Sequence, residues 1–107
     1  MTFWVIHIPF LNVPGMALYP FVLVKKNEYK RDAVLINHEL IHLRQQLELF
    51  ILPFYVLYLL EYLINLFKYK NHNKAYFNIS FEKEAYAKEQ DLSYLKERSW
   101  YNWTKYC

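Results

Sequence analysis

The residues that constrain this chain most are His38 and His42, which stand four positions apart in the pattern His-Glu-x-x-His. Residues four apart lie on one face of an α-helix, so the pattern favours a helix with both imidazoles on the same side. Two imidazoles at this spacing can bind one metal ion, and Glu39 can then reach a metal-bound water as a general base. The pattern predicts a zinc site that hydrolyses peptide bonds. The alternative is a pair of helical histidines that only form hydrogen bonds.

The composition indicates one folded domain over 1–107 that does not bind nucleic acid. Hydrophobic residues make up 55% of the chain and aromatic residues 21%, which is not the composition of a disordered segment. A chain of this length has room for one domain with one core. The formal charge is only +3 and the basic residues are scattered, so nucleic acid is not an expected partner. Cys107 is the single cysteine, which excludes an internal disulfide and a cysteine-based zinc site.

The N-terminal segment does not resemble a secretory signal. Its first ten residues are apolar, but they lack a basic region and contain His7 and Pro9. We therefore expect the catalytic portion to be cytoplasmic.

The expected fold is mainly helical, with a short β-hairpin or edge strands in a strand and loop region over 1–31. Aromatic and β-branched residues favour strands at 2–8 and 16–24. Pro20 lies inside the second of these, and a proline confines a strand to an edge or a bulge.

Two helical regions are expected after the strands. Asp32 is a suitable N-cap for a long helix that carries the His-Glu-x-x-His pattern, and Pro53 should kink this helix within the region 32–70. The second helical region, at 80–98, would supply a further metal ligand. The remaining segments are an Asn-rich turn over 71–78 and an aromatic tail over 99–107.

The segment 47–67 is unusually apolar, and its environment stays open at this stage. Its uncharged run is about twelve residues long, whereas a spanning helix needs about twenty. A carboxylate stands just beyond each end of that run, at Glu48 and Glu61. A helix that is apolar all round must be covered by protein or by lipid. Three environments remain possible: a membrane, in which the helix is embedded or interfacial, the core of a monomer, and an oligomer interface.

A catalytic zinc ion usually has three protein ligands, so the pattern requires a third. Glu84 is the preferred third ligand, because the small Ala85 and Ala87 beside it would let its helix approach the first helix closely. Glu82 is the alternative ligand, on a different face of the same helix. The candidates for this third ligand are His7, His72, Glu82, Glu84 and Glu89.

The pattern followed by Glu-Ala-x-Ala on a second helix resembles the gluzincin class of metallopeptidases. The nearest analogues are minigluzincins and the membrane-embedded prenyl-protein endopeptidase and heat-shock protease family. The resemblance covers 38–42 and 81–88, and it implies a zinc site with Glu84 as the third ligand and Glu39 as the base. The chain also resembles a type of short bacterial protein that pairs His-Glu-x-x-His and Gln-Gln with Phe-Glu-x-Glu-Ala-Tyr.

In the gluzincin class an aspartate often follows the third ligand by four residues and orients a histidine. Lys88 stands at that position here, so the groups that orient the ligands must come from elsewhere. The candidates are Asn37, Asp91 and Glu82. Tyr86 is a candidate for stabilising an oxyanion, as is Tyr94, although tyrosines in such a composition more often serve packing.

Two functional hypotheses follow from the sequence. The first is a zinc-dependent peptidase acting on a peptide or protein substrate, with membrane association through 47–67 or an oligomer as further possibilities. The alternative is a non-catalytic metal-binding protein that interacts with a membrane or a partner.

Overall fold

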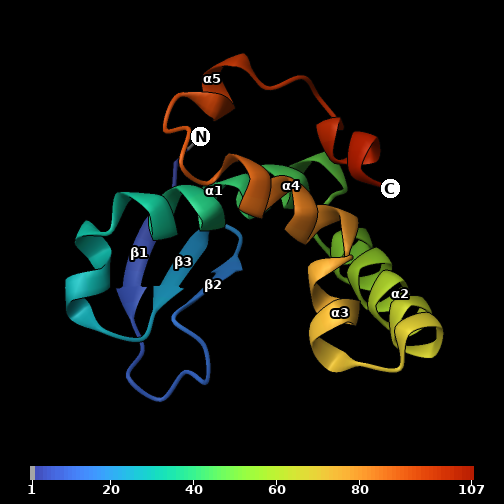
Figure 1. Cartoon of the computed structure of the whole chain (residues 1–107). Coiled ribbons are helices and arrows are strands. Elements are labelled where there is room, and N and C mark those ends of the chain that lie inside the picture. The colour runs from blue at the N-terminus through green and yellow to red at the C-terminus, as the bar shows by residue number, and fades with distance from the viewer. Residues whose placement is uncertain (1) are drawn as a thin grey trace.

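Three short strands form a small sheet at the N-terminal side of the molecule (Figure 1). The computed structural model describes residues 2–107. The strands are β1 (Trp4–His7), β2 (Gly15–Leu18) and β3 (Phe21–Val24), in the order β1-β3-β2. β1 runs parallel to β3, while β2 and β3 form an antiparallel hairpin. The single strand expected over 16–24 is therefore two strands, because Tyr19 and Pro20 form the turn between them.

One face of this sheet packs against α1 (Ala33–Glu48). Alternate residues of a strand point to opposite faces, and Val22 and Val24 are buried together with Leu43 of α1. The other face leaves Trp4 and Phe21 exposed side by side, with ring centroids 6.0 Å apart. The sheet thus supports α1 from one side.

Helix α1 begins and ends close to the expected positions. A short 3-10 helix, η1 (Asn27–Arg31), precedes it, and the Asp32 side chain caps it by accepting a hydrogen bond from Leu35 N at 3.1 Å. The chain then bends by 111° into α2 (Leu52–Tyr69), which confirms the kink. Pro53 lies in the first turn of α2, where backbone N–H groups have no acceptor within the helix, so a proline costs no helical hydrogen bond there.

The region after α2 contains more elements than expected. The segment expected as a turn over 71–78 forms a helix, α3 (His72–Phe77), because the Asn71 side chain caps it. The helix expected over 80–98 is divided into α4 (Ser80–Lys88) and α5 (Tyr94–Glu97). Asp91 makes the break, since its carboxylate accepts hydrogen bonds from the backbone and hydroxyl of Ser93. A 3-10 helix, η2 (Asn102–Tyr106), follows α5.

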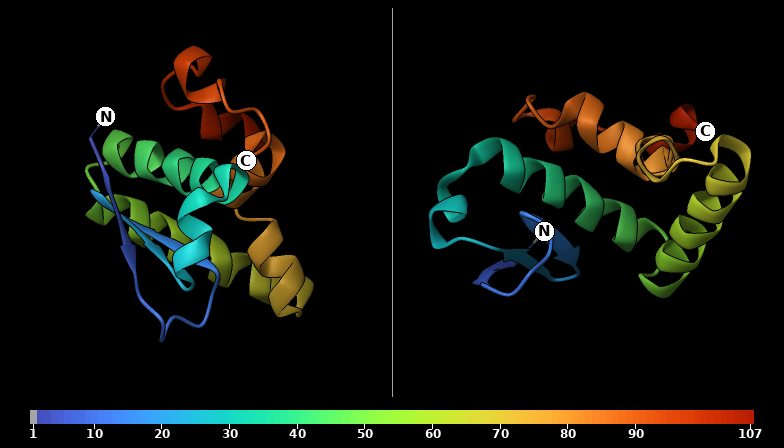
Figure 2. Two further views of the ribbon diagram at one scale, coloured as in Figure 1. Left: turned by 90° about the vertical axis from the view of Figure 1, so that its left-hand side faces the viewer. Right: turned by 60° about the horizontal axis from the view of Figure 1, so that its bottom comes forward.

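Helix α1 is the central element, with the sheet on one side and α4 on the other (Figure 2). Ile41 of α1 is buried with Ala85 and Tyr94, on the side opposite the sheet. A third buried cluster joins Phe54 of α2 to Phe81 of α4. This arrangement brings α4 against the face of α1 that carries the histidines.

No single helix among residues 2–107 is long and apolar enough to cross a membrane, although α1 and α2 together meet the same test of length and composition as a bent pair.

Candidate metal centre

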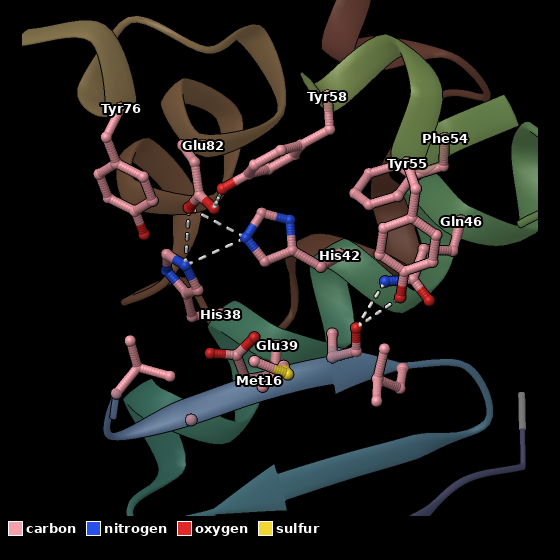
Figure 3. Close-up of a pocket in the computed structure, with 14 residues that line it drawn as sticks. Met16, His38, Glu39, His42, Gln46, Phe54, Tyr55, Tyr58, Tyr76 and Glu82 are labelled. Carbon is pink, nitrogen blue, oxygen red and sulfur yellow. Dashed lines mark hydrogen bonds and ion pairs between the residues drawn. The ribbon is translucent and has the colours of Figure 1, made fainter. Parts of the chain in front are cut away.

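Three buried side chains from α1 and α4 converge on one point (Figure 3). Glu82 Oε1 lies 3.2 Å from His38 Nε2 and 3.0 Å from His42 Nε2. The two Nε2 atoms are 3.2 Å apart. His38, His42 and Glu82 could therefore hold a metal ion, and we call them the His–Glu centre.

The spacing of the three donor atoms fits a metal ion. A tetrahedral ion with bonds of about 2.0–2.1 Å holds its donor atoms about 3.3 Å apart. The separations in the His–Glu centre, 3.0 to 3.2 Å, are close to this value. Imidazole and carboxylate donors suit several divalent transition metals. The centre thus has the chemistry and the dimensions of a three-ligand site.

The expectation that Glu84 is the third ligand is wrong, because its carboxylate faces away from the histidines. Residues two apart on a helix point about 200° apart, so Glu82 and Glu84 cannot both face α1 in the same way. Glu84 Oε2 accepts a hydrogen bond from Arg98 Nε at 2.6 Å, and Glu84 Oε1 accepts one from Gln45 Nε2 at 2.9 Å. Hydrophobic spacing does not distinguish these glutamates, since both lie within one turn of the buried Phe81.

The other ligand candidates lie outside the His–Glu centre. His7 Nε2 hydrogen-bonds to Lys25 O at 3.2 Å, and His72 Nδ1 to the Tyr62 hydroxyl at 2.8 Å. Glu89 lies beside the centre as a partner of a ligand rather than as a ligand.

The outer nitrogen of each imidazole has its own partner. His38 Nδ1 lies 2.9 Å from Glu89 Oε1, and His42 Nδ1 lies 2.8 Å from Gln45 Oε1. An acceptor at Nδ1 fixes the proton there and leaves Nε2 free to bind metal. Sequence reasoning missed both partners in this role, although Glu89 stands one residue after the Lys88 that replaces the usual acid.

The residues expected to orient the histidines act in other ways. Asn37 Nδ2 donates to the backbone oxygens of Lys88, Glu89 and Asp91, at 2.8 to 3.3 Å. Asn37 therefore holds the end of α4 that carries Glu89 and does not contact an imidazole ligand atom. The Asp91 carboxylate is used by Ser93, so its expected role at the site is wrong.

The charges in the centre are strongly coupled. Burial alone would raise the pKa of Glu82, but His42 and hydrogen bonds from both imidazoles and Tyr58 outweigh it and lower that pKa. Burial alone would lower the pKa of His42, but the Glu82 carboxylate raises it to about 9. A metal ion binding here would thus displace a proton from His42.

Glu39 is the buried carboxylate that completes the site. It lies between the histidines and β2 (Figure 3), and burial raises its pKa against the opposing effect of His42 and His38. A Cβ atom added at Gly15 would lie 3.1 Å from Glu39 Oε2. The carboxylate therefore reaches the edge of the sheet.

Tyrosines surround the centre in different roles. The Tyr58 hydroxyl donates to Glu82 Oε2 at 2.6 Å, a contact that the sequence does not indicate. Tyr86 packs its ring edge-on against His38, with centroids 4.5 Å apart, and its hydroxyl meets that of Tyr76. The Tyr94 hydroxyl donates to Glu84, so Tyr94 belongs to the buried ion-pair network.

Two hollows meet at the His–Glu centre. One, of about 260 Å³, reaches from the centre to Phe54 and Tyr58 of α2. The other, of about 590 Å³, extends towards α3 and Glu89. Both are lined by His38 and Glu39, so together they form a cleft that crosses the centre.

Comparison of the chain with family models, curated proteins and solved structures gives no match.

Proposed function

We propose that this chain is a zinc-dependent peptidase with a small gluzincin-like site. The observation that carries the proposal is the convergence of His38, His42 and Glu82 beside a buried Glu39 in a cleft. Two imidazoles and one carboxylate are a common zinc ligand set, and three protein ligands leave the fourth position to water. Zinc bound there would lower the pKa of that water to about 7 and polarise the scissile carbonyl.

Glu39 has the properties of the general base and acid in this reaction. Burial raises its pKa, which favours a carboxylate that can accept a proton and pass it on. In hydrolysis the water oxygen bonds to the carbonyl carbon and its proton passes to Glu39. The C–N bond then breaks, and the same proton moves from Glu39 to the leaving nitrogen.

The free edge of β2 offers a place for an extended substrate. In an antiparallel pair, hydrogen-bonded and non-hydrogen-bonded residue pairs alternate. Lys25 N donates to Pro14 O, so Gly15 and Ala17 belong to non-hydrogen-bonded pairs and their backbone N–H and C=O groups point away from β3. Ala17 O is occupied, since it accepts hydrogen bonds from Gln46 Nε2 and the Tyr55 hydroxyl. A peptide added as a strand would therefore pair with Gly15 and with the N–H of Ala17.

Metal analysis of purified protein tests the ligand set. We expect about one zinc per chain in the wild type. Glu84→Gln keeps all three donors and should also bind zinc, with lower affinity because Glu84 orients Gln45. His38→Ala and Glu82→Ala should lose the metal, whereas Glu97→Ala, which changes an exposed glutamate, should keep it. Stoichiometric zinc in Glu82→Ala would overturn the assignment of the third ligand.

Peptide cleavage tests the reaction. Incubation with a mixture of unstructured peptides, followed by mass spectrometry, should reveal zinc-dependent products with the wild type and with Glu97→Gln. Glu39→Gln should retain zinc and lose cleavage by at least about 100-fold, the usual range for a general base. Undiminished cleavage by Glu39→Gln would refute the mechanism. A cobalt-substituted spectrum with four protein ligands would instead favour a structural metal site.

A further inference from the structure

The polar side chains of α2 between Leu52 and Phe67 point into the protein rather than towards solvent. The Glu61 carboxylate accepts hydrogen bonds from the backbone N and the hydroxyl of Ser80, at 3.0 and 2.8 Å. Asn65 Nδ2 donates to Ala75 O at 3.1 Å, and the Tyr58 hydroxyl donates to Glu82. The charged and amide groups of the helix between Leu52 and Phe67 are therefore satisfied internally.

The opposite side of α2 is an exposed apolar surface, which we call the outer face of α2. At 100° per residue its side chains span about 140° of the helix circumference. The exposed fraction is 86% for Phe67, 74% for Leu52 and 65% for Ile64. The outer face consists of Leu52, Val56, Leu59, Leu60, Leu63, Ile64 and Phe67. This polarity is the reverse of that of a surface helix in water, whose polar face is turned outwards.

We propose that the outer face of α2 lies on the surface of an anionic lipid bilayer. Lys68 and Lys70 are exposed at the C-terminal end of α2, and Lys74 is exposed in α3, which follows it. Apolar residues that enter the boundary of the acyl chains, flanked by lysines that reach phosphate head groups, are the features that bind a helix in a membrane interface. No single helix among residues 2–107 is long and apolar enough to cross a membrane, and in this proposal α2 lies along the surface.

The charges favour lipid over a second copy of the chain as the occupant. Two copies packed through this face in parallel would bring their lysines together, and antiparallel packing would place Lys68 and Lys70 beside the apolar start of the other helix. The single carboxylate of α2, Glu61, is already bonded to Ser80 on the inner side. Neither arrangement gives the lysines a counter-charge, whereas anionic head groups do.

The position of α2 links this surface to the cleft. α2 lies at the periphery of the molecule (Figure 1), and its inner side contributes Phe54, Tyr55 and Tyr58 to the cleft (Figure 3). A bilayer on the outer face would thus lie about one helix diameter, about 10 Å, from the cleft wall. This inference stands on the surface of α2 alone and is independent of whether the His–Glu centre cleaves peptides.

Flotation with vesicles tests the apolar contact. The full chain should float with phosphatidylcholine vesicles that contain 30% phosphatidylglycerol. In Leu63→Ser/Phe67→Ser the partition coefficient between vesicles and water should fall by at least about tenfold. The reason is that Leu63 and Phe67 each remove a large apolar surface from water when the wild-type chain binds the bilayer. The matched control is Phe10→Ser/Leu92→Ser, which changes residues that are 82% and 60% exposed on other parts of the surface. All four positions are exposed, so circular dichroism should show native folding in both variants.

The lysines are tested in the same assay. Replacement of Lys68, Lys70 and Lys74 by Gln should lower the partition coefficient by about 100-fold, at about fivefold for each lysine. Replacement of Lys25, Lys26 and Lys30 by Gln removes the same charge elsewhere and should change it far less. Three outcomes would overturn the proposal. They are no flotation of the wild type, equal loss in the controls, and a dimer in sedimentation equilibrium that Leu63→Ser/Phe67→Ser dissociates without changing flotation.

Discussion

At the scale of single residues, Gln45 connects the His–Glu centre to the buried ion pairs behind it. Gln45 Nε2 donates to Phe81 O at 3.1 Å and to Glu84 Oε1 at 2.9 Å. This leaves Gln45 Oε1 to accept the hydrogen bond from His42 Nδ1. Glu84 is therefore not a ligand, but it orients the Gln45 side-chain amide. That amide in turn determines which nitrogen of His42 carries the proton.

Gln45→Met should weaken zinc binding without removing a ligand. The side chains are similar in volume, but methionine offers His42 Nδ1 no comparable acceptor, and loss of such a partner typically lowers metal affinity by about 10- to 100-fold. Competition with a chelator at a temperature where the variant is folded would measure this. An unchanged zinc affinity would show that Gln45 does not position His42.

Gly15→Ala should impair turnover more than metal binding. The added methyl group would lie 3.1 Å from Glu39 Oε2 and 3.2 Å from Leu35 Cδ1, closer than ordinary contacts. Glu39 would have to shift by a few tenths of an ångström. Since a displacement of about 1 Å in a catalytic group can cost about 100-fold in rate, we expect a smaller but measurable loss. Zinc content and peptide cleavage measured on the same sample separate the effects. Parallel loss of both would point to a distorted centre instead.

Single residues also show where prediction from sequence stops. His38, His42 and Glu39 could be predicted as one group because a single local pattern places them. The third ligand could not be chosen between Glu82 and Glu84, because the choice depends on which of the two carboxylates pairs with Arg98. Arg98 is 16 positions after Glu82 and 14 after Glu84, so no local pattern predicts that pairing. Glu89 and Gln45 were also missed as hydrogen-bond partners of His38 and His42. The partner of a histidine Nδ1 does not stand at a fixed distance from the histidine in the sequence, so no pattern predicts it.

At the scale of elements, Arg98 joins α1, α4 and the C-terminal segment. Its guanidinium donates to Glu84 of α4 and to Glu48 of α1, with distances of 2.6 to 3.0 Å. Hydrogen bonds from Arg98, Tyr94 and Gln45 outweigh the effect of burial on Glu84 and lower its pKa. The ion pairs are fully buried, so they hold these elements in one relative position.

Arg98→Met should destabilise the fold strongly. It leaves the Glu48 and Glu84 carboxylates buried without their cation, and breaking a buried pair in this way typically costs about 3–5 kcal/mol. Urea unfolding followed by circular dichroism would measure the loss. Arg31→Met, which removes an exposed arginine, should change the free energy of unfolding by less than about 0.5 kcal/mol. Equal effects of the two substitutions would contradict a structural role for Arg98.

The elements themselves could be predicted in part. Periodicity, Asp32 and Pro53 indicated the long helix and its kink, because helix caps and prolines act locally. The split of 16–24 into a hairpin and the break at Asp91 were missed, since each depends on one turn whose residues are also compatible with a continuous element. Helix α3 was missed because it is short and polar, and its packing against α2 stabilises it.

At the scale of the whole molecule, the His–Glu centre joins two elements that are 40 positions apart in sequence. His42 belongs to α1, which also supports the sheet, and Glu82 belongs to α4, which packs against η2. The chain is small, and the buried apolar residues among 2–107, except Ala75, are divided among three clusters. Zinc bound between α1 and α4 would therefore act as a cross-link in a molecule with little apolar core to spare.

Removal of zinc should lower the melting temperature of the folded chain. A ligand that binds only the native state at about 100 times its dissociation constant adds about 2.7 kcal/mol to stability. For a domain of this size that corresponds to a shift of roughly 10–20 °C. Thermal unfolding with zinc and with excess chelator should show this shift in the wild type and in Glu97→Ala. His38→Ala and Glu82→Ala should unfold at one temperature in both solutions, because they lack a complete donor set. A full shift in Glu82→Ala would mean that the stabilising zinc binds elsewhere on the chain.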